Sequence, residues 1–352
     1  MSRGDADLQR LPTSRVRRLF SRAYDPLRTR LAGYKVGWVL VAAVIVLDWL
    51  WIRWLSLPLS PTLVIRFAGI TAGLWLAALA LSAISRRHAR PSVRHLALAL
   101  MWLALLQCFF FATDVMQYLS VTAAAPLVDE HLISADAWLG FDWLTHYRWV
   151  HSHPLIDGVL TLAYVSFWVQ LLLIPLVLAC HPDRNRLPEF VGIIMVTTLL
   201  TVLISLPMPA SNTFLHYQIA GAGGADWYSD FFPLRNGAFS GFSELPRQGL
   251  IALPSFHAAT AVLVTYAVRF TRAFPYWFAL NLLMLISTPS RGGHYLVDVI
   301  AGTLLAVVVI AVGRFLLRRR LVEAPTQTDC PAHSTAKAIP CRGECRCEGC
   351  PQ

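Results

Sequence analysis

Two histidines, each at the head of an apolar run, are the residues of this sequence best suited to chemistry. The motif at 254–257 reads Pro-Ser-Phe-His and precedes the apolar run 258–270, and the motif at 290–298 reads Ser-Arg-Gly-Gly-His-Tyr-Leu-Val-Asp and precedes the run 299–312. One further apolar run, 274–287, lies between them. Two membrane crossings between the motifs would bring both histidines to one face, each at a helix N-terminus. Unpaired N–H groups and the helix dipole favour an anion at such a position.

His294 and Asp298, in the second motif, indicate a more specific chemistry than the first motif does. They are four residues apart, so on a helix they share one face and their side chains can meet. A carboxylate bonded to one imidazole nitrogen fixes the tautomer and leaves the other nitrogen free to attack. His294 is therefore a candidate nucleophile toward phosphorus, and His257 is the candidate general acid for the leaving oxygen. The alternative reading is a chance His-x-x-x-Asp pair on a helix.

The two motifs resemble those of a known family. Pro-Ser-Phe-His resembles the Pro-Ser-x-His motif of the type-2 phosphatidic acid phosphatase superfamily, and Ser-Arg followed by His-x-x-x-Asp resembles its last motif. The forms Ser-Phe-His-Ala-Ala and Gly-Gly-His-Tyr are closer to the branch of inositol phosphorylceramide synthases and sphingomyelin-synthase-like transferases. The resemblance implies that His294 attacks phosphorus, Asp298 orients it and His257 protonates the leaving group. It also implies that Ser255 lies at the phosphate.

The sequence departs from the family pattern at the phosphate-binding residues. Only two glycines separate Arg291 from His294, and the family's first motif, a lysine followed by Arg-Pro, is absent because the only lysines are Lys35 and Lys337. The phosphate must then be held in another way. Arginine offers a bidentate fork to phosphate, so the candidates are Arg291 and two cations of a long loop, Arg235 and Arg247. The alternative for the two loop arginines is that they face solvent.

Composition indicates a membrane protein. The 352 residues are 56% hydrophobic and only 14% charged, with a mean hydropathy of +0.54, and the apolar residues form runs long enough to cross a bilayer. The net charge of +10 comes from clusters beside these runs rather than from a separate basic face, so nucleic acid is not expected as a partner. We predict an all-α polytopic bundle with eight spans, at about 36–57, 63–84, 95–120, 155–180, 188–207, 254–271, 274–289 and 295–316.

The distribution of charge predicts the topology. With a cytoplasmic N-terminus, each connection expected inside carries arginines, whereas the segment 121–154 is acidic and is expected outside. Both termini are then cytoplasmic, and both histidine motifs face the periplasm or exterior of an inner or plasma membrane. The predicted regions are a basic tail (1–35), N-terminal spans (36–120), an interfacial segment (121–154), a catalytic core (155–317) with an outer loop (209–253), and a disordered Cys-rich tail (318–352).

The outer loop and the tail raise two further expectations. The loop leads directly into Pro254, so it is expected to lie over the site. Five of the seven cysteines crowd the tail, which allows a metal site as an alternative to a tail without a bound ion. We expect no metal and no cofactor in catalysis, because histidines, arginines and helix N-termini supply the acid, the nucleophile and the anion stabilisation.

These features favour an enzyme that acts on a lipid phosphate ester at the outer leaflet through a phosphohistidine. Water as the acceptor makes the enzyme a phosphatase, and an inositol, sugar or lipid hydroxyl makes it a phosphotransferase. A transporter and a catalytically silent membrane protein are the alternatives. The paired histidine motifs at one face argue against both of them.

Overall fold

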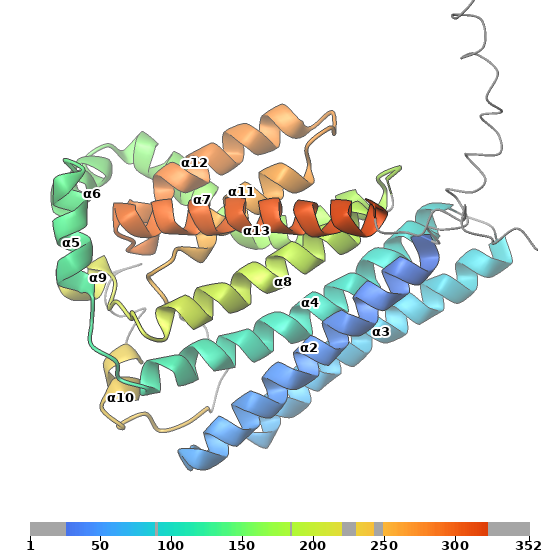
Figure 1. Cartoon of the computed structure of the whole chain (residues 1–352), viewed down its shortest axis with the longest axis horizontal. Coiled ribbons are helices and arrows are strands. Elements are labelled where there is room, and N and C mark those ends of the chain that lie inside the picture. The colour runs from blue at the N-terminus through green and yellow to red at the C-terminus, as the bar shows by residue number, and fades with distance from the viewer. Residues whose placement is uncertain (1–25, 89–90, 184, 220–229, 243–248, 323–352) are drawn as a thin grey trace, which may run out of the picture.

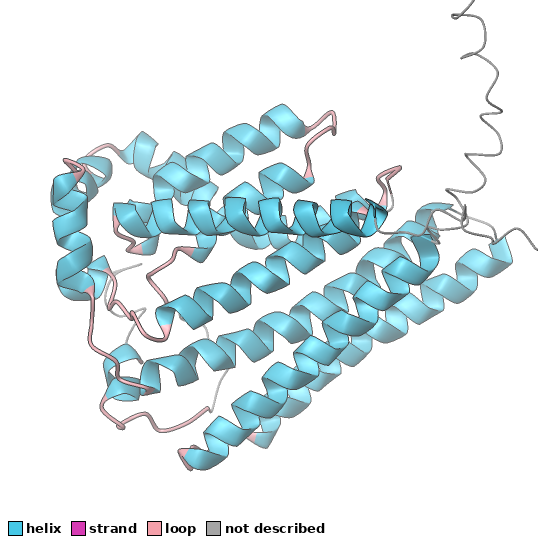
Figure 2. Ribbon diagram, viewed as in Figure 1, coloured by secondary structure: helices cyan, strands magenta, loops and turns pink. Residues whose placement is uncertain are grey.

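The computed structural model describes residues 26–88, 91–183, 185–219, 230–242 and 249–322, and the chain in these ranges is helical (Figures 1 and 2). No β-strand occurs in them, so the predicted all-α class is confirmed. The helices are α2 (Pro26–Trp54), α3 (Pro61–His88), α4 (Pro91–Thr122), α5 (Asp129–Trp138), α6 (Trp143–His151), α7 (Pro154–Ala179), α8 (Arg186–Ser205), α9 (Thr213–His216), α10 (Phe231–Arg235), α11 (Phe256–Ala267), α12 (Phe274–Gly292) and α13 (Leu296–Val322).

Local sequence explains where the long helices begin and end. Four of them, α2, α3, α4 and α7, start at a proline, which lacks the N–H that the first turn leaves unpaired. Helix α12 ends at Gly293, which has a φ of 65°. This left-handed conformation suits glycine at a helix C-terminus.

The long helices form two groups that share one core. Helices α2, α3 and α4 pack together, while α7, α8, α11, α12 and α13 form the second group, and α4 joins them through α7 and α8 (Figure 1). The shared core is built from large side chains that are almost fully buried, among them Leu105, Phe109, Phe190, Ile194 and Leu263. The second group spans residues 154–322, which contain the region 155–317, and that this region is the catalytic core stays a prediction.

Among the described residues, six helices are long and apolar enough to cross a membrane, so the chain is an integral membrane protein. They are α2, α3, α4, α7, α8 and α13. Helix α11 is apolar but has only 12 residues, and α12, with 19 residues, is not among the six. Both run along the bundle with the others, and the count of eight spans stays a prediction.

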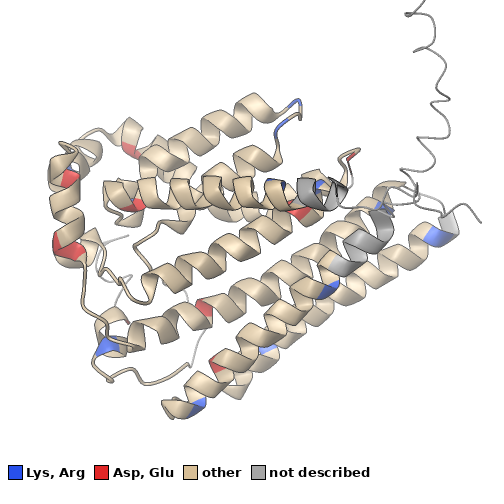
Figure 3. Cartoon of the chain, viewed as in Figure 1, with Lys and Arg blue, Asp and Glu red and all other residues tan. Residues whose placement is uncertain are grey.

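The two ends of the bundle differ. The first turn of α2 and the last turn of α13 lie at one end, and the short helices α5, α6, α9 and α10 lie at the other (Figure 1). Several acidic residues gather at the end of the short helices (Figure 3). This arrangement agrees with the charge pattern of the sequence, whereas the face that is cytoplasmic stays a prediction.

The predicted interfacial segment folds as two short helices. Asp142 caps α6 by accepting a hydrogen bond from the Thr145 main-chain N–H at 2.6 Å. Trp138 and Trp149 are exposed, at 86% and 51%, as expected for side chains at the headgroup level. Trp143, by contrast, is buried between its neighbours and belongs to the site described below.

The described part of the predicted outer loop packs at two separate places. Helix α9 contacts the second histidine motif, because the Thr213 main-chain N–H donates to the Gly293 carbonyl oxygen at 2.9 Å, whereas α10 packs on α4. Phe242 forms an isolated bridge with Leu59 in the α2–α3 turn. The described part of the loop therefore contacts α4, the α2–α3 turn and Gly293 of the second histidine motif. Residues 220–229 and 243–248, and with them Arg247, lie outside the described ranges, as do the Cys-rich tail from 323 and the basic tail to residue 25.

Candidate active site

The fold brings the two histidine motifs into direct contact. The Ser255 main-chain N–H donates to the Asp298 carbonyl oxygen at 3.0 Å, which joins the start of α11 to the first turn of α13. One turn further along α13, a Cβ placed on Gly302 would overlap the Ser255 carbonyl oxygen. The two helices approach this closely only because residue 302 has no side chain.

We predict that Gly302→Ala separates the two motifs. The added methyl group must push α13 away from Ser255, which costs about 1–3 kcal/mol of stability and moves Asp298 relative to His257. A thermal unfolding scan in detergent and a turnover assay should both show a loss. Gly313→Ala on the same helix is the matched control, because its Cβ would meet only Ile193 Cγ2 at 3.9 Å. Equal behaviour of the two variants would contradict this account of the packing.

His294 and Asp298 form the pair expected from their spacing. Nδ1 of His294 lies 3.5 Å from Oδ2 of Asp298, and the side chain of Asp298 is fully buried. The same Oδ2 accepts a hydrogen bond from the Tyr295 main-chain N–H at 3.0 Å. This bond holds the carboxylate in place, so Nδ1 faces Asp298 and Nε2 is the nitrogen available for attack.

The N-terminus of α13 is occupied by a carboxylate of the protein itself. Asp136 of α5 accepts from the Leu296 and Val297 main-chain N–H groups, each at 2.9 Å. The expectation that both helix N-termini would bind a substrate anion is therefore wrong for α13. The Asp136 side chain already accepts hydrogen bonds from the first-turn N–H groups, where the helix dipole favours a carboxylate. The N-terminus of α11 stays a candidate.

A second carboxylate of α5 holds the residue that follows the nucleophile. Asp129 accepts a hydrogen bond from the Tyr295 hydroxyl at 2.8 Å and two further bonds from Ser211. Asp129 and Asp136 are seven residues apart, so they lie two turns apart on one face of α5. That spacing was the sequence signal for these two carboxylates, which together form an acidic clamp. From the sequence alone they were expected only to belong to an acidic outer segment.

We predict that Asp136→Ala weakens the catalytic helix. The variant leaves two first-turn N–H groups of α13 without their cap, a change that costs about 0.5–2 kcal/mol at helix N-termini. The melting temperature and turnover should both fall. Glu130→Ala is the control, since Glu130 is an exposed carboxylate on the same helix. A fall of the same size in both variants would mean that net charge, and not the cap, is responsible.

The two glycines before His294 are explained by close neighbours. A Cβ on Gly293 would lie 2.6 Å from the Phe214 ring of α9. A Cβ on Gly292 would lie 2.8 Å from Cδ2 of His294 and 2.9 Å from the Tyr164 hydroxyl oxygen. Real Cβ atoms do not approach so closely, so the Gly-Gly pair is what allows α9 and α7 to reach the nucleophile.

His257 is held by aromatic side chains of α7. The Tyr164 ring stacks on the imidazole with centroids 4.2 Å apart, and the Phe167 ring lies at the same distance. The Tyr164 hydroxyl oxygen is 3.5 Å from Nδ1 of His257. Ser255, expected at the phosphate, caps α11 by accepting from the Ala258 N–H at 3.3 Å. Tyr164 lies in neither motif, and its only signal in the sequence was a polar hydroxyl within an apolar run.

Arg291 is oriented by a carboxylate of α7. Its guanidinium is ion-paired with Asp157, whose side chain also has Nε2 of His151 at 3.9 Å. Burial lowers the pKa of His151, so this histidine is mainly neutral at pH 7. Nε of Arg291 is buried without a partner among the described residues. Arg291 therefore has a fixed position and an unused donor, which suits a group that binds phosphate.

Arg235 has partners of its own. It donates to the main-chain carbonyl oxygens of Ala125 at 2.8 Å and Ala124 at 3.4 Å, just beyond the end of α4. These bonds give Arg235 a structural role at the α4 terminus. Phosphate binding by Arg235 stays a prediction, and Arg247 lies outside the described residues.

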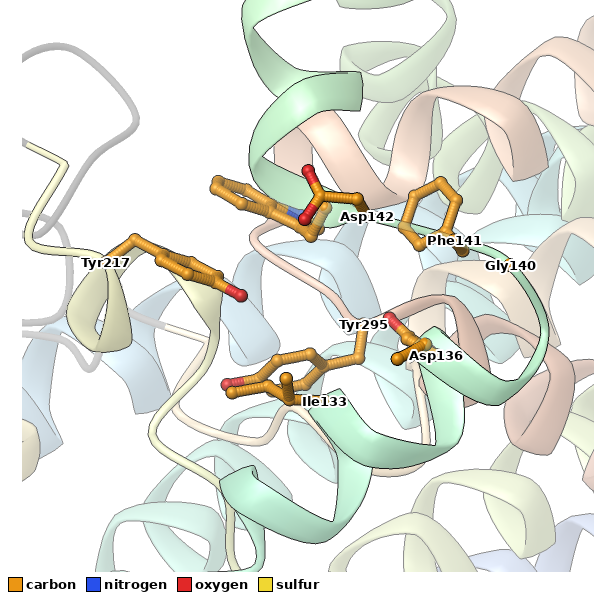
Figure 4. A pocket seen from close by; sticks show the side chains of 9 residues that line it. Ile133, Asp136, Gly140, Phe141, Asp142, Tyr217 and Tyr295 are labelled. Carbon is orange, nitrogen blue, oxygen red and sulfur yellow. The ribbon is translucent and has the colours of Figure 1, made fainter.

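A cavity of about 250 Å³ opens beside Tyr295, formed by α5, α6 and α9 (Figure 4). Aromatic rings and two carboxylates line it, and no lysine or arginine does. Hydrogen bonds from Thr145 lower the pKa of Asp142, which is therefore ionised at neutral pH. A phosphate group would be repelled here, whereas hydroxyl groups would find acceptors. The lining residues are Ile133, Asp136, Ala137, Gly140, Phe141, Asp142, Trp143, Tyr217 and Tyr295.

The wall between this cavity and Arg291 is a stack of three aromatic rings. Trp143 lies parallel to Tyr217 at 5.3 Å and to Tyr147 at 5.0 Å. The Trp143 indole N–H donates to the Pro289 carbonyl oxygen at 2.9 Å, close to the end of α12. The cavity is thus attached to the same helix end that presents Arg291 and the two glycines.

Metal ligands do not cluster in the described ranges. No group of three or more His, Cys, Asp or Glu side chains there has the geometry to hold an ion. The cysteines of the tail, where the sequence allowed a metal site, lie outside these ranges.

Comparison with known proteins gives one match. Residues 130–312, just over half of the chain, match the protein-family model described as the PAP2 superfamily. The match begins in α5 and ends in α13, so it includes Asp136, both histidine motifs and Tyr164, and it starts one residue after Asp129. Neither the curated proteins nor the solved structures include a significant match.

Proposed function

Because the chain belongs to the PAP2 superfamily, whose members are phosphoesterases and phosphotransferases, we propose that it cleaves a lipid phosphate ester through a covalent phosphohistidine on His294. His257 is the general acid and base, and Asp298 orients the nucleophile. The observation that carries the proposal is the contact between the two motifs, which joins His257 and the His294–Asp298 pair at one end of the bundle.

In the first step Nε2 of His294 attacks phosphorus and the bond from phosphorus to the leaving oxygen breaks. His257 gives its proton to that oxygen, so a neutral alcohol departs. The developing imidazolium of His294 is stabilised by Asp298, which is buried and held by the Tyr295 N–H. Arg291 and the start of α11 stabilise the negative charge on the phosphoryl oxygens.

In the second step His257 removes a proton from an acceptor hydroxyl, whose oxygen attacks phosphorus. The bond from phosphorus to Nε2 breaks and His294 regains its lone pair. With water as the acceptor the product is a phosphate, and with an alcohol it is a new ester. His257 thus donates a proton in one step and recovers it in the other.

The proposal is tested with purified protein in detergent micelles. Dioleoyl phosphatidic acid labelled in its phosphate should give acid-labile, base-stable label on the protein, and this label should map to His294. Label on another residue, or turnover without any labelled intermediate, would contradict the proposed chemistry.

Transfer to an alcohol is the second candidate, and the cavity beside Tyr295 favours it. A cavity with aromatic walls and two carboxyl groups, of which Asp142 is ionised, accepts hydrogen bonds from a polyhydroxylated acceptor and disfavours anions. This agrees with the resemblance of the Gly-Gly-His-Tyr form to inositolphosphotransferases. Adding inositol or glycerol to the assay should convert labelled phosphate into a labelled ester, and unchanged release of free phosphate would exclude transfer to these acceptors.

The substrate then reaches the enzyme from the outer leaflet. The positive-inside pattern favours the periplasmic or exterior side for the end that carries α5 and α6, and the exposure of Trp138 and Trp149 suits side chains at the headgroup level. Membrane-impermeant labelling of a cysteine introduced at Glu130 tests this orientation, since a residue accessible only from the cytoplasm would reverse it.

A further inference from the structure

We propose that His151 is a further phosphate-binding residue, which takes up a proton as the substrate binds and places a second positive charge beside Arg291. The inference rests on the proposed function, in which Arg291 stabilises the phosphoryl oxygens. It assigns a role to a histidine of α6 that belongs to neither motif. Three side chains that meet between α6, α7 and α12 carry it, namely His151, Asp157 and Arg291.

The net charge of this trio depends on His151. Oδ1 of Asp157 is the oxygen that pairs with the Arg291 guanidinium, and it also lies 3.9 Å from Nε2 of His151. While the imidazole is neutral, the charges of Arg291 and Asp157 cancel. A phosphate monoester carries roughly two negative charges at neutral pH, and no lysine occurs in residues 130–312. One proton on His151 gives the trio the net positive charge that an anion needs.

The hydrogen bond of His151 to its own helix identifies the nitrogen that accepts this proton. Nδ1 lies 3.0 Å from the main-chain carbonyl oxygen of Tyr147. A carbonyl oxygen can only accept, so Nδ1 carries the proton of the neutral ring and Nε2 has the free lone pair. Because Nε2 is the nitrogen that faces Asp157, the added proton lies between the imidazole and the carboxylate. Asp157 then competes less strongly with the phosphate for Arg291.

The surroundings of the ring suit both protonation states. The groups that face it among the described residues are Tyr147 from its own helix, Asp157 from α7 and Arg291 from α12. Burial lowers the pKa of His151, the hydrogen bond to Tyr147 opposes this, and the charge of Arg291 lowers it further. A bound phosphate has the opposite effect on the pKa, and the Tyr147 ring, with its centroid 4.0 Å away, also favours a cation. The side chain is 31% exposed, so the proton comes from water.

The test measures phosphate binding at about pH 5.5 and about pH 8, on either side of the ordinary histidine pKa. Inorganic phosphate that binds the folded protein raises its melting temperature, so this shift reports binding without any turnover. KM for dioleoyl phosphatidic acid is measured in parallel. Wild-type protein should bind phosphate more tightly at the lower pH, although phosphate itself is less charged there.

Two variants of His151 separate its charge from its shape. His151→Gln should raise KM by about three- to fivefold at the lower pH, the upper range for a partly exposed ion pair, and leave kcat unchanged. At the higher pH its KM should equal the wild-type value, because the wild-type imidazole is then neutral. His151→Arg has a permanent charge, so its KM at the higher pH should be about three- to fivefold below the wild-type value. Ionisation of the substrate is the same for every variant and cancels in these ratios.

His153→Gln is the matched control, because His153 is an exposed histidine whose Nδ1 lies 2.7 Å from the Trp149 carbonyl oxygen. It should match the wild type at both pH values. Wild-type binding by His151→Gln at the lower pH would overturn the inference, as would a His151→Arg variant that keeps the wild-type difference between the two pH values. Normal turnover by His294→Ala would instead overturn the proposed function, while the melting-temperature shifts would still report on His151.

Discussion

His294→Ala is expected to abolish turnover with every substrate. The variant lacks the atom that attacks phosphorus, so no covalent intermediate forms, whatever the leaving group. The expected result is loss of the labelled phosphohistidine together with loss of turnover on both phosphatidic acid and 4-nitrophenyl phosphate. A better leaving group cannot compensate, because the step that is missing precedes its departure.

His131→Ala is the matched control, since His131 is an exposed histidine on α5. It should keep normal labelling and turnover. Asp298→Asn should lie between the control and His294→Ala, because it disturbs the tautomer of His294 and leaves the ring in place. If the activated substrate restores turnover in His294→Ala, then His294 is the proton donor and the two histidine roles are reversed.

His257→Ala is expected to lower turnover on the lipid by about 10²–10⁴-fold, the range that general acid catalysis contributes. The His294–Asp298 pair remains intact in this variant, so the nucleophile can still attack. A nitrophenolate leaves without a proton, and the loss with 4-nitrophenyl phosphate should therefore be much smaller. The two rates are measured on the same preparation, so their ratio is independent of the fraction of folded protein.

The result would count against the proposed roles in either of two cases. Equal losses on both substrates would mean that His257 binds the phosphate instead of protonating the leaving group. Normal turnover on the lipid by both the His257 and the His294 variants would exclude the enzyme as proposed.

Several structural features could be read from the sequence because they depend on short distances along the chain. The spacing of His294 and Asp298 is one helical turn, and their side chains meet as that spacing predicts. The apolar runs correspond to the long helices, since chain segments in a bilayer must pair their own N–H and C=O groups. The serine before Phe256 caps α11, and a glycine ends α12.

The seven-residue spacing of Asp129 and Asp136 places both on one face of a helix, but the partners of the acidic side chains could not be read from the sequence. Asp136 caps α13 from a helix 160 residues earlier, Asp129 reaches Tyr295 and Asp157 pairs with Arg291. Each of these bonds joins helices whose relative placement no local pattern encodes. The same holds for Arg235, which bonds to main-chain carbonyl oxygens after α4.

By itself, the sequence determined that the protein is an all-α membrane protein with two histidine motifs, because composition, apolar length and helical spacing are local properties. Only the tertiary structure decided how the motifs meet and what surrounds them. Positions 302 and 292 require glycine because Ser255 and Tyr164, on other helices, approach them too closely for a side chain. Close packing between helices depends on the shapes of both contacting surfaces. The sequence does not show which two surfaces will meet.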